Sequence, residues 1–176
     1  MGKTYVVSYI VAALCVLNTN AANIIWKIGK ADNSASELAL GPSSYKDFLA
    51  KDFGYEDRYF LIGNSKDDKD FPYVLPGPNN VWGGTWRTSG WRTHSTNILF
   101  GLDRIAEHGE CRLVIDLLDA DPKRSLVKVL VNSVEKKFEI KGKSEKVLDG
   151  VVDEAKEQVL EIPIAASDLK IGGNIV

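Results

Sequence analysis

The chain has 176 residues, with 22 lysines and arginines against 24 aspartates and glutamates, which gives a formal net charge of −2 at pH 7. This length suits one domain with a hydrophobic core and excludes a multidomain enzyme. The balanced charge offers no basic surface to nucleic acid or to an anionic membrane. Two cysteines are too few for a disulfide scaffold, so the fold must depend on packing.

The first 21 residues predict a secretory signal peptide. A positively charged start precedes an apolar run at residues 5–17, and small and polar residues follow up to Ala22. The run is shorter than the ~20 residues that span a bilayer, and no later segment is apolar enough to do so. Leu14 before Cys15 disfavours a lipoprotein site, which requires a small residue there. We therefore expect a secreted or periplasmic protein whose mature domain is residues 22–176.

Cys111 is the only cysteine that remains if cleavage follows Ala21. A single thiol cannot form an internal disulfide. Because Cys111 alternates with Leu113 and Ile115 in a strand-like run, we expect it to lie in the core.

Short apolar runs separated by turn residues dominate the mature sequence, and such runs predict strands. They lie at residues 24–29, 58–63, 97–102, 111–118, 126–132, 134–140 and 158–164. The phase of the alternation shifts across Asn132-Ser133, which predicts a hairpin there. Helix signals are weak: one or two turns at residues 43–52, and at most one at residues 167–170.

Strands joined by polar loops, without intervening helices, predict an all-β antiparallel sandwich. The C-terminal residues 172–176 begin one more strand that stops after about three residues, whereas strands typically have about 5–6. A truncated or separated N-terminal piece of a longer polypeptide is the favoured interpretation. A short, exposed edge strand is the alternative.

Residues 71–94 contain three of the four tryptophans and three of the six prolines. Proline lacks the amide donor and fixes the backbone, so this segment is predicted to be a stiff loop. Aromatic faces pack against sugar rings, and the planar forks of arginine pair with uronic-acid carboxylates. The predicted carbohydrate-binding residues are Tyr73, Trp82, Trp86, Arg87, Trp91 and Arg92, with Asn79, Asn80 and His94 as further polar groups.

The alternative for these aromatic residues is a plug that folds back over one end of the sandwich. This structural interpretation is favoured for Tyr73 and Trp82. For Trp86 and Trp91, which are flanked by glycine and threonine, both interpretations stay open.

An acidic, hairpin-like loop is predicted at Asp67, Asp68 and Asp70, whose oxygens suit Ca²⁺. The spacing matches no EF-hand, and Lys66 and Lys69 partly neutralise the loop. A solvated loop is therefore favoured over a structural calcium site, and no cofactor is predicted.

Catalytic signals are few. No zinc-ligand spacing surrounds His94 or His108, and no glycine-rich phosphate loop follows a strand. A metalloenzyme or a nucleotide-dependent enzyme is therefore not expected, and no catalytic residue is predicted. Paired carboxylates of a glycoside hydrolase stay open, since their separation is invisible in a sequence.

Two stretches resemble a known family. Trp26, Ile28-Gly29, Asp32 and Glu37 resemble the pattern that opens the carbohydrate-binding-like β-sandwich domain of rhamnogalacturonan lyases of polysaccharide lyase family four. Residues 59–63, 69–78 and 82–84 look like the matching segment of related bacterial polysaccharide lyase-like modules. The likeness covers most of residues 24–176. It implies a jelly-roll, galactose-binding-like sandwich with a last strand that residues 174–176 only begin.

In the lyases that the chain resembles, this module follows a separate catalytic domain, and no family catalytic residue has a matching position here. The resemblance therefore implies a non-catalytic, exported module that binds pectic polysaccharide such as rhamnogalacturonan. The alternatives are a structural module that braces a downstream catalytic domain, or a part of a polysaccharide lyase or glycoside hydrolase. The expected partners are a polysaccharide and that downstream domain, with no nucleic acid and no membrane span. The stretch from Thr85 to Thr93 is longer than the family's link.

Overall fold

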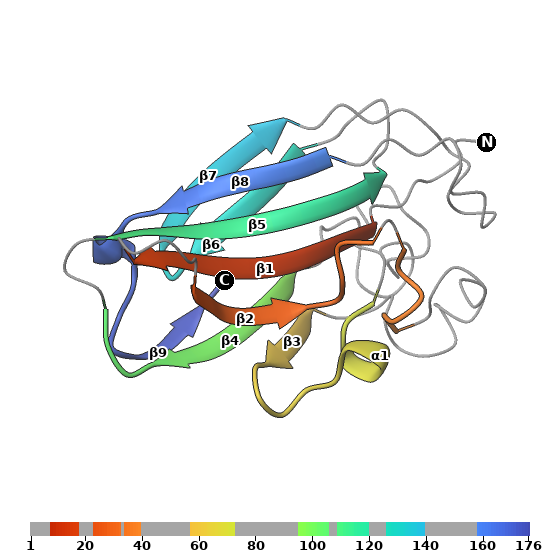
Figure 1. Ribbon diagram of the computed structural model, residues 1–176, viewed down its shortest axis with the longest axis horizontal. Helices are drawn as coiled ribbons and strands as arrows, with labels where there is room; N and C mark the ends of the chain where they lie inside the picture. The colour runs from red at the N-terminus through yellow and green to blue at the C-terminus, as the bar shows by residue number, and fades with distance from the viewer. Residues whose placement is uncertain are drawn as a thin grey trace.

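The computed structural model of the protein describes residues 8–17, 23–32, 34–39, 57–72, 95–105, 109–119, 126–139 and 158–176. Most of these residues form strands, and very few form helix (Figure 1). The elements are β1 (Ser8–Leu17), β2 (Asn23–Ile28), β3 (Arg58–Leu61), α1 (Asp67–Asp70), β4 (Thr96–Leu102), β5 (Gly109–Asp119), β6 (Leu126–Val131), β7 (Val134–Glu139), β8 (Gln158–Ile164), the 3-10 helix η4 (Ala166–Asp168) and β9 (Gly172–Ile175).

The strands form two layers. One layer is an antiparallel sheet in the order β2-β1-β5-β8, and Figure 1 shows it in front of the β3-β4-β9 sheet and the β6-β7 pair. The amide of Asn132 donates to the Ile175 carbonyl at 2.8 Å, and the amide of Ile175 donates to the Asn132 side chain at 3.2 Å. The hairpin thereby joins β9, and the predicted all-β sandwich is confirmed.

The core lies between the layers. In β5 the buried side chains of Leu113, Ile115 and Leu117 recur at every second position, as expected for a strand with one buried face. Trp26 of β2 contacts Phe100 of β4, with ring centroids 5.5 Å apart. The other members of the core include Ile28, Phe60, Phe71, Ile98, Val129, Val131, Ile162 and Ile164.

All seven predicted strands are present, as β2 to β8. The predicted hairpin is confirmed: β6 pairs with β7, and Asn132 in the turn has φ 53°, a left-handed conformation that asparagine tolerates. The single turn predicted near residue 168 is η4. The helix predicted at residues 43–52 lies outside the described residues.

One pair of strands does not run antiparallel, contrary to what the sequence led us to expect. β3 and β4 run parallel, with Arg58 opposite Thr96 and Leu61 opposite Leu99. Alternation of apolar residues predicts which residues are buried but not in which direction a strand runs. A parallel pair requires a crossover connection, and residues 62–95 provide one.

Strand β1 lies within the segment predicted as a signal peptide, and it occupies the position between β2 and β5. Its ten paired positions include Cys15, which stands opposite Cys111. Cys111 is half-buried against the core, as expected, and it is disulfide-bonded, which was not expected. Cys15 is the only other cysteine of the chain. It lies in residues 1–21, which the sequence analysis predicts to be cleaved off as a signal peptide.

The short last strand predicted at the C-terminus is β9, which pairs with β4. Val176 extends this pairing, since its amide and carbonyl both bond to Ile98, at 2.9 and 2.7 Å. No helix of the described part of the chain is long and apolar enough to cross a membrane.

Candidate functional site

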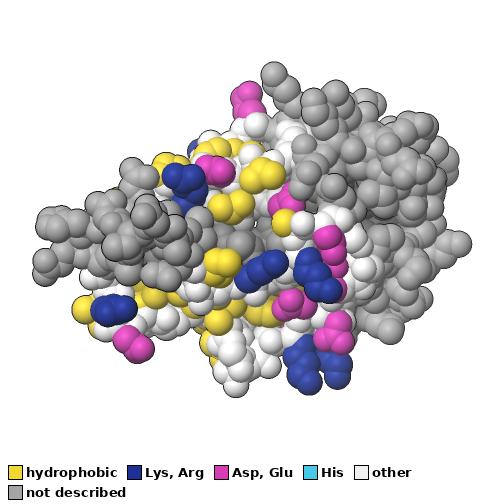
Figure 2. All heavy atoms as spheres, in the orientation of Figure 1, with side chains coloured by type: hydrophobic (Ala, Val, Ile, Leu, Met, Phe, Trp, Pro, Cys, Tyr) yellow, Lys and Arg dark blue, Asp and Glu magenta, His cyan; other side chains and the backbone are white. Residues whose placement is uncertain are grey.

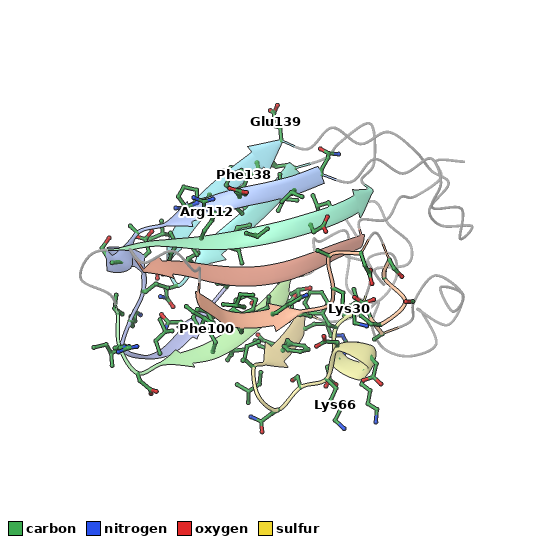
Figure 3. The ribbon with its side chains drawn as sticks, in the orientation of Figure 1. Lys30, Lys66, Phe100, Arg112, Phe138 and Glu139 are labelled. Carbon is green, nitrogen blue, oxygen red and sulfur yellow. The ribbon has the colours of Figure 1, made fainter. Side chains whose placement is uncertain are left out.

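The candidate site is one end of the sandwich, which we call the rim. It is formed by Gly29 and Lys30 after β2, by the first residues of β3 and β4, and by α1. Figure 1 shows these elements converging at one end, and Figure 3 places Lys30 and Lys66 there, beside α1. The predicted binding segment, residues 73–94, leaves the described structure at Pro72 and re-enters it at Ser95.

The end of β2 is fastened to α1. Gly29 has φ 72°, a conformation that favours glycine, and its amide donates to Asp67 Oδ2 at 2.9 Å. The amide of Lys30 donates to Glu37 Oε1 at 2.6 Å. These carboxylates satisfy backbone donors where the chain turns out of the sheet, so they stabilise the rim.

The first attachment point of residues 73–94 is anchored in the core. Phe71 is fully buried, and its ring meets that of Phe60 edge-on, with centroids 5.7 Å apart. The amide of Ala39 donates to the Phe71 carbonyl at 2.9 Å, and Ala39 forms a bridge with Pro72. The chain therefore leaves the fold from a fixed position beside β3.

The second attachment point is also on β3. The amide of Arg58 donates to the Ser95 carbonyl at 2.8 Å, and the amide of Ser95 donates to Asp57 Oδ1 at 2.8 Å. The side chain of Asn97 donates to the Arg58 carbonyl at 3.0 Å. Arg58 and Phe60 are two residues apart, about 7 Å along a strand, so both attachment points make contacts with one short strand.

The six predicted binding residues all lie outside the residues that the structure describes. They are Tyr73, Trp82, Trp86, Arg87, Trp91 and Arg92, and Asn79, Asn80 and His94 lie outside them as well. What the structure adds is the set of residues that anchor their segment. No sequence signal pairs Asp57 with Ser95, which lies 38 positions away.

The prediction of a hairpin-like acidic loop was wrong, because Asp67–Asp70 is the short helix α1. The Asp70 side chain accepts from the amide of Lys66 at 2.7 Å, a local bond that favours a helical turn over a hairpin. Figure 2 shows lysine and acidic side chains gathered around α1. Within the described residues, no group of three or more histidine, cysteine, aspartate or glutamate side chains is arranged to hold a metal ion.

The outer face of the β2-β1-β5-β8 sheet carries paired charges. Arg112 of β5 lies 2.6 Å from Glu161 of β8, measured from Nη1 to Oε2 (Figure 3 labels Arg112). Lys136 of β7 donates to the Pro163 carbonyl at the edge of this sheet and lies 4.0 Å from Asp168. These groups bond within the protein, whereas the predicted aromatic and arginine residues belong to the sequence of residues 73–94.

The family comparison decides what kind of domain this is. The sequence profile of the family described as CBM-like, polysaccharide lyase family 4, domain III matches residues 24–176. The chain belongs to this CBM-like family. The match begins at β2 and ends after β9, so the CBM-like domain includes the whole rim, while β1 precedes it. No curated protein and no solved structure gives a significant match.

Membership makes this protein a carbohydrate-binding-like module, as the sequence resemblance implied. The matched residues contain the two fastenings of residues 73–94 and the core on which they depend. In this CBM-like domain, the rim therefore combines a rigid base with the segment richest in tryptophan.

Proposed function

We propose that this CBM-like domain is a non-catalytic, exported module of a rhamnogalacturonan lyase-like system and binds pectic polysaccharide at the rim. The predicted contacts are Tyr73, Trp82, Trp86, Arg87, Trp91 and Arg92. The observation that carries the proposal is the anchoring of both ends of residues 73–94 on β3.

Such anchoring favours binding because it reduces the ordering that a ligand must impose. A loop held at both ends loses less conformational freedom on binding than a free one, and more of the contact energy appears as affinity. The chemistry fits an acidic glycan. Indole rings pack on the apolar faces of sugars, and arginine pairs with carboxylates in a planar, two-bond geometry.

Affinity electrophoresis in gels that contain rhamnogalacturonan, polygalacturonate or a neutral galactan tests this function. We expect the acidic glycans to retard the protein, and we expect Trp86→Ala and Trp91→Ala each to weaken binding about tenfold or more, as truncated aromatic anchors do. Arg87→Ala and Arg92→Ala should weaken binding to acidic glycans only. Leu130→Ala is the control, since Leu130 is an exposed apolar residue of β6, which is not part of the rim.

Two results would contradict the proposal. Retardation by none of the glycans would exclude binding, and an equal loss in the Leu130→Ala control would show that binding does not depend on residues 73–94. Release of unsaturated products or new reducing ends from rhamnogalacturonan would show a lyase or hydrolase instead of a non-catalytic module.

Exposed apolar side chains favour a second function, bracing of a catalytic domain. Ile171 is 71% exposed and Ile24 is 59% exposed, and both lie in the matched domain. Such residues suit a protein contact when they lie together. Gel filtration of this chain with a candidate catalytic domain tests it. Co-elution that Ile171→Asp abolishes, without any glycan binding, would favour bracing.

A further inference from the structure

The β3-β4-β9 sheet has one face in the core and one face outside it. Phe60, Ile98 and Phe100 are buried, toward the β2-β1-β5-β8 sheet that Figure 1 shows in front. Successive side chains of a strand point to opposite faces, so the residues between the buried ones point away from the core. We call these positions the outer face: every second residue in Tyr59–Leu61 of β3, Asn97–Gly101 of β4 and Gly173–Ile175 of β9.

The register arranges the outer face in three rows across the strands. Residues in register on adjacent strands point to the same face, so each row forms one continuous surface. Starting from the rim, the rows are Tyr59 with Asn97, Leu61 with Leu99 and Ile175, and Gly101 with Gly173. None of these side chains is charged, and the rows extend about 14 Å along β4.

The row nearest the rim has the chemistry of a sugar contact. Tyr59 is 64% exposed, between the two residues of β3 that hold the ends of residues 73–94. Asn97 stands opposite Tyr59, and the bond from its Nδ2 to the Arg58 carbonyl fixes its carboxamide. An aromatic ring packs on the apolar face of a sugar, and a carboxamide offers a donor and an acceptor to hydroxyl groups. Tyr59 and Asn97 therefore join the outer face to the rim.

The glycine row leaves the backbone uncovered at the far end of the outer face. Neither Gly101 nor Gly173 has a positive φ, and a Cβ built on either would meet no atom of another part of the chain within 4 Å. The fold therefore does not require glycine at these positions, and glycine weakens a strand. Paired glycines instead allow a ligand to approach the sheet closely.

The outer face favours neutral sugars over acidic ones. A carboxylate that left water for this surface would lose hydration without gaining a cationic partner, which costs free energy. The middle row offers the aliphatic side chains of Leu61, Leu99 and Ile175 to the C–H groups of a neutral ring. The arginines predicted to pair with uronic acids, Arg87 and Arg92, belong to residues 73–94 instead.

We propose that the outer face is a second glycan subsite, which binds neutral sugars of the same polysaccharide whose acidic sugars bind at the rim. The proposal rests on the proposed glycan-binding function and adds a specificity to it. A polymer that mixes acidic and neutral sugars would occupy both surfaces at once, and linked binding exceeds the affinity of either surface alone. The chain would lie along β4, so the subsite recognises a stretch of several sugars.

A neutral galactan tetrasaccharide tests the subsite without a carboxylate for the arginines. In NMR titrations of the full chain, it should shift the methyl signals of Leu61, Leu99 and Ile175 and the amide signals of Gly101 and Gly173, and these shifts should saturate. A tetragalacturonate, which is acidic throughout, should leave these five signals unchanged and shift others.

Gly101→Val and Gly173→Val test the glycine row. Each places a branched side chain over the sheet and should weaken tetrasaccharide binding about tenfold or more, while tetragalacturonate binding stays within about twofold of the parent. The urea midpoint of each variant should not fall, because β-branched residues favour strands. Leu130→Val is the matched control on β6, outside the outer face, and should bind both oligosaccharides like the parent.

A second pair of variants tests the row at the rim. Tyr59→Ala should weaken tetrasaccharide binding about tenfold, and Tyr59→Phe should retain it because the ring is kept. Tetrasaccharide shifts that avoid the outer face, or equal affinities of parent and glycine variants, would overturn the subsite. Self-association of the chain that Leu61→Asp abolishes would also overturn it, in favour of a protein contact. Failure of the proposed function is separate, since tetragalacturonate would then not bind at all.

Discussion

Asn174 of β9 is a buried polar residue, only 4% exposed. Its Oδ1 accepts from the Lys170 amide at 2.8 Å and from Asn132 Nδ2 at 3.1 Å. Its Nδ2 donates to the carbonyls of Lys170 at 2.8 Å and Gly172 at 3.1 Å. These four bonds use the donors and acceptors of one carboxamide, and they fix the turn that leads into β9.

Asn174→Ala should lower the free energy of unfolding by about 1–3 kcal/mol, because it removes four hydrogen bonds at once, three of them to backbone groups of the turn. Urea denaturation measures the change. Asn97→Ala is the control: the Asn97 side chain donates to the Arg58 carbonyl, so its loss should cost about 1 kcal/mol. Equal losses in the two variants would contradict a special role for the carboxamide of Asn174.

The β6-β7 hairpin brings two like charges together. Lys128 stands directly opposite Lys137 in the register, an arrangement that destabilises a sheet. Glu135 compensates for it, since its carboxylate lies 3.0 Å from Lys128 Nζ and 2.9 Å from Lys137 Nζ. Hydrogen bonds from Lys137 and Lys128 hold the pKa of Glu135 below its usual 4.5.

This lowered pKa predicts a pH dependence at the hairpin. The folded protein favours ionised Glu135, so its contribution is full above about pH 4.5 and is lost as the pH falls through the lower, folded pKa. The stability difference between the parent and Glu135→Gln should therefore shrink on acidification, in thermal melts from neutral pH to about pH 3. Glu139→Gln makes the same charge change at the end of β7 and controls for net charge. A difference that is independent of pH would contradict this role.

The sequence predicts which segments form strands better than it predicts how these strands pair and in which direction they run. Residues 126–131 and 134–139 alternate with period two, and a turn of two residues leaves a hairpin as the only short connection. The direction of β3 relative to β4 depends on a connection of more than 30 residues, which local patterns do not encode. The apolar run of β1 satisfies the requirements of a leader and of a central strand equally well.

The sequence likewise predicts one part of the candidate site and not the other. Composition identifies residues 73–94 as the segment with binding chemistry, because tryptophan, arginine and proline coincide there. Two bonds of the rim, Gly29 to Asp67 and Ser95 to Asp57, each join residues 38 positions apart. Such pairs are set by tertiary packing, and neither has a local sequence signal.

At the scale of the whole molecule, the tryptophans fall into two groups. Trp26 lies in the core, 4% exposed, and the other three belong to the segment attached at the rim. Binding requires at least Trp86 and Trp91 to be accessible, whereas a plug or a bracing surface would protect them. Accessibility to a charged quencher therefore separates the interpretations.

Iodide should quench the tryptophan fluorescence of the parent protein several-fold more than that of the variant Trp82→Phe, Trp86→Phe, Trp91→Phe. The variant retains only Trp26, which packed side chains shield from an anion. Stern–Volmer plots measure both constants, and a single Trp86→Phe or Trp91→Phe change assigns the accessible ring. Equal, low constants for parent and variant would favour the plug or the bracing function.

The parallel pairing of β3 with β4 has a consequence for how ligand choice can change. The connection must return the chain to the end from which β3 starts, so it is long by necessity, and residues 73–94 lie inside it. Insertions and substitutions in this stretch leave the ladder bonds between the described strands intact. The stretch can therefore be exchanged as a cassette between Pro72 and Ser95, which would give new glycan preferences on an unaltered scaffold.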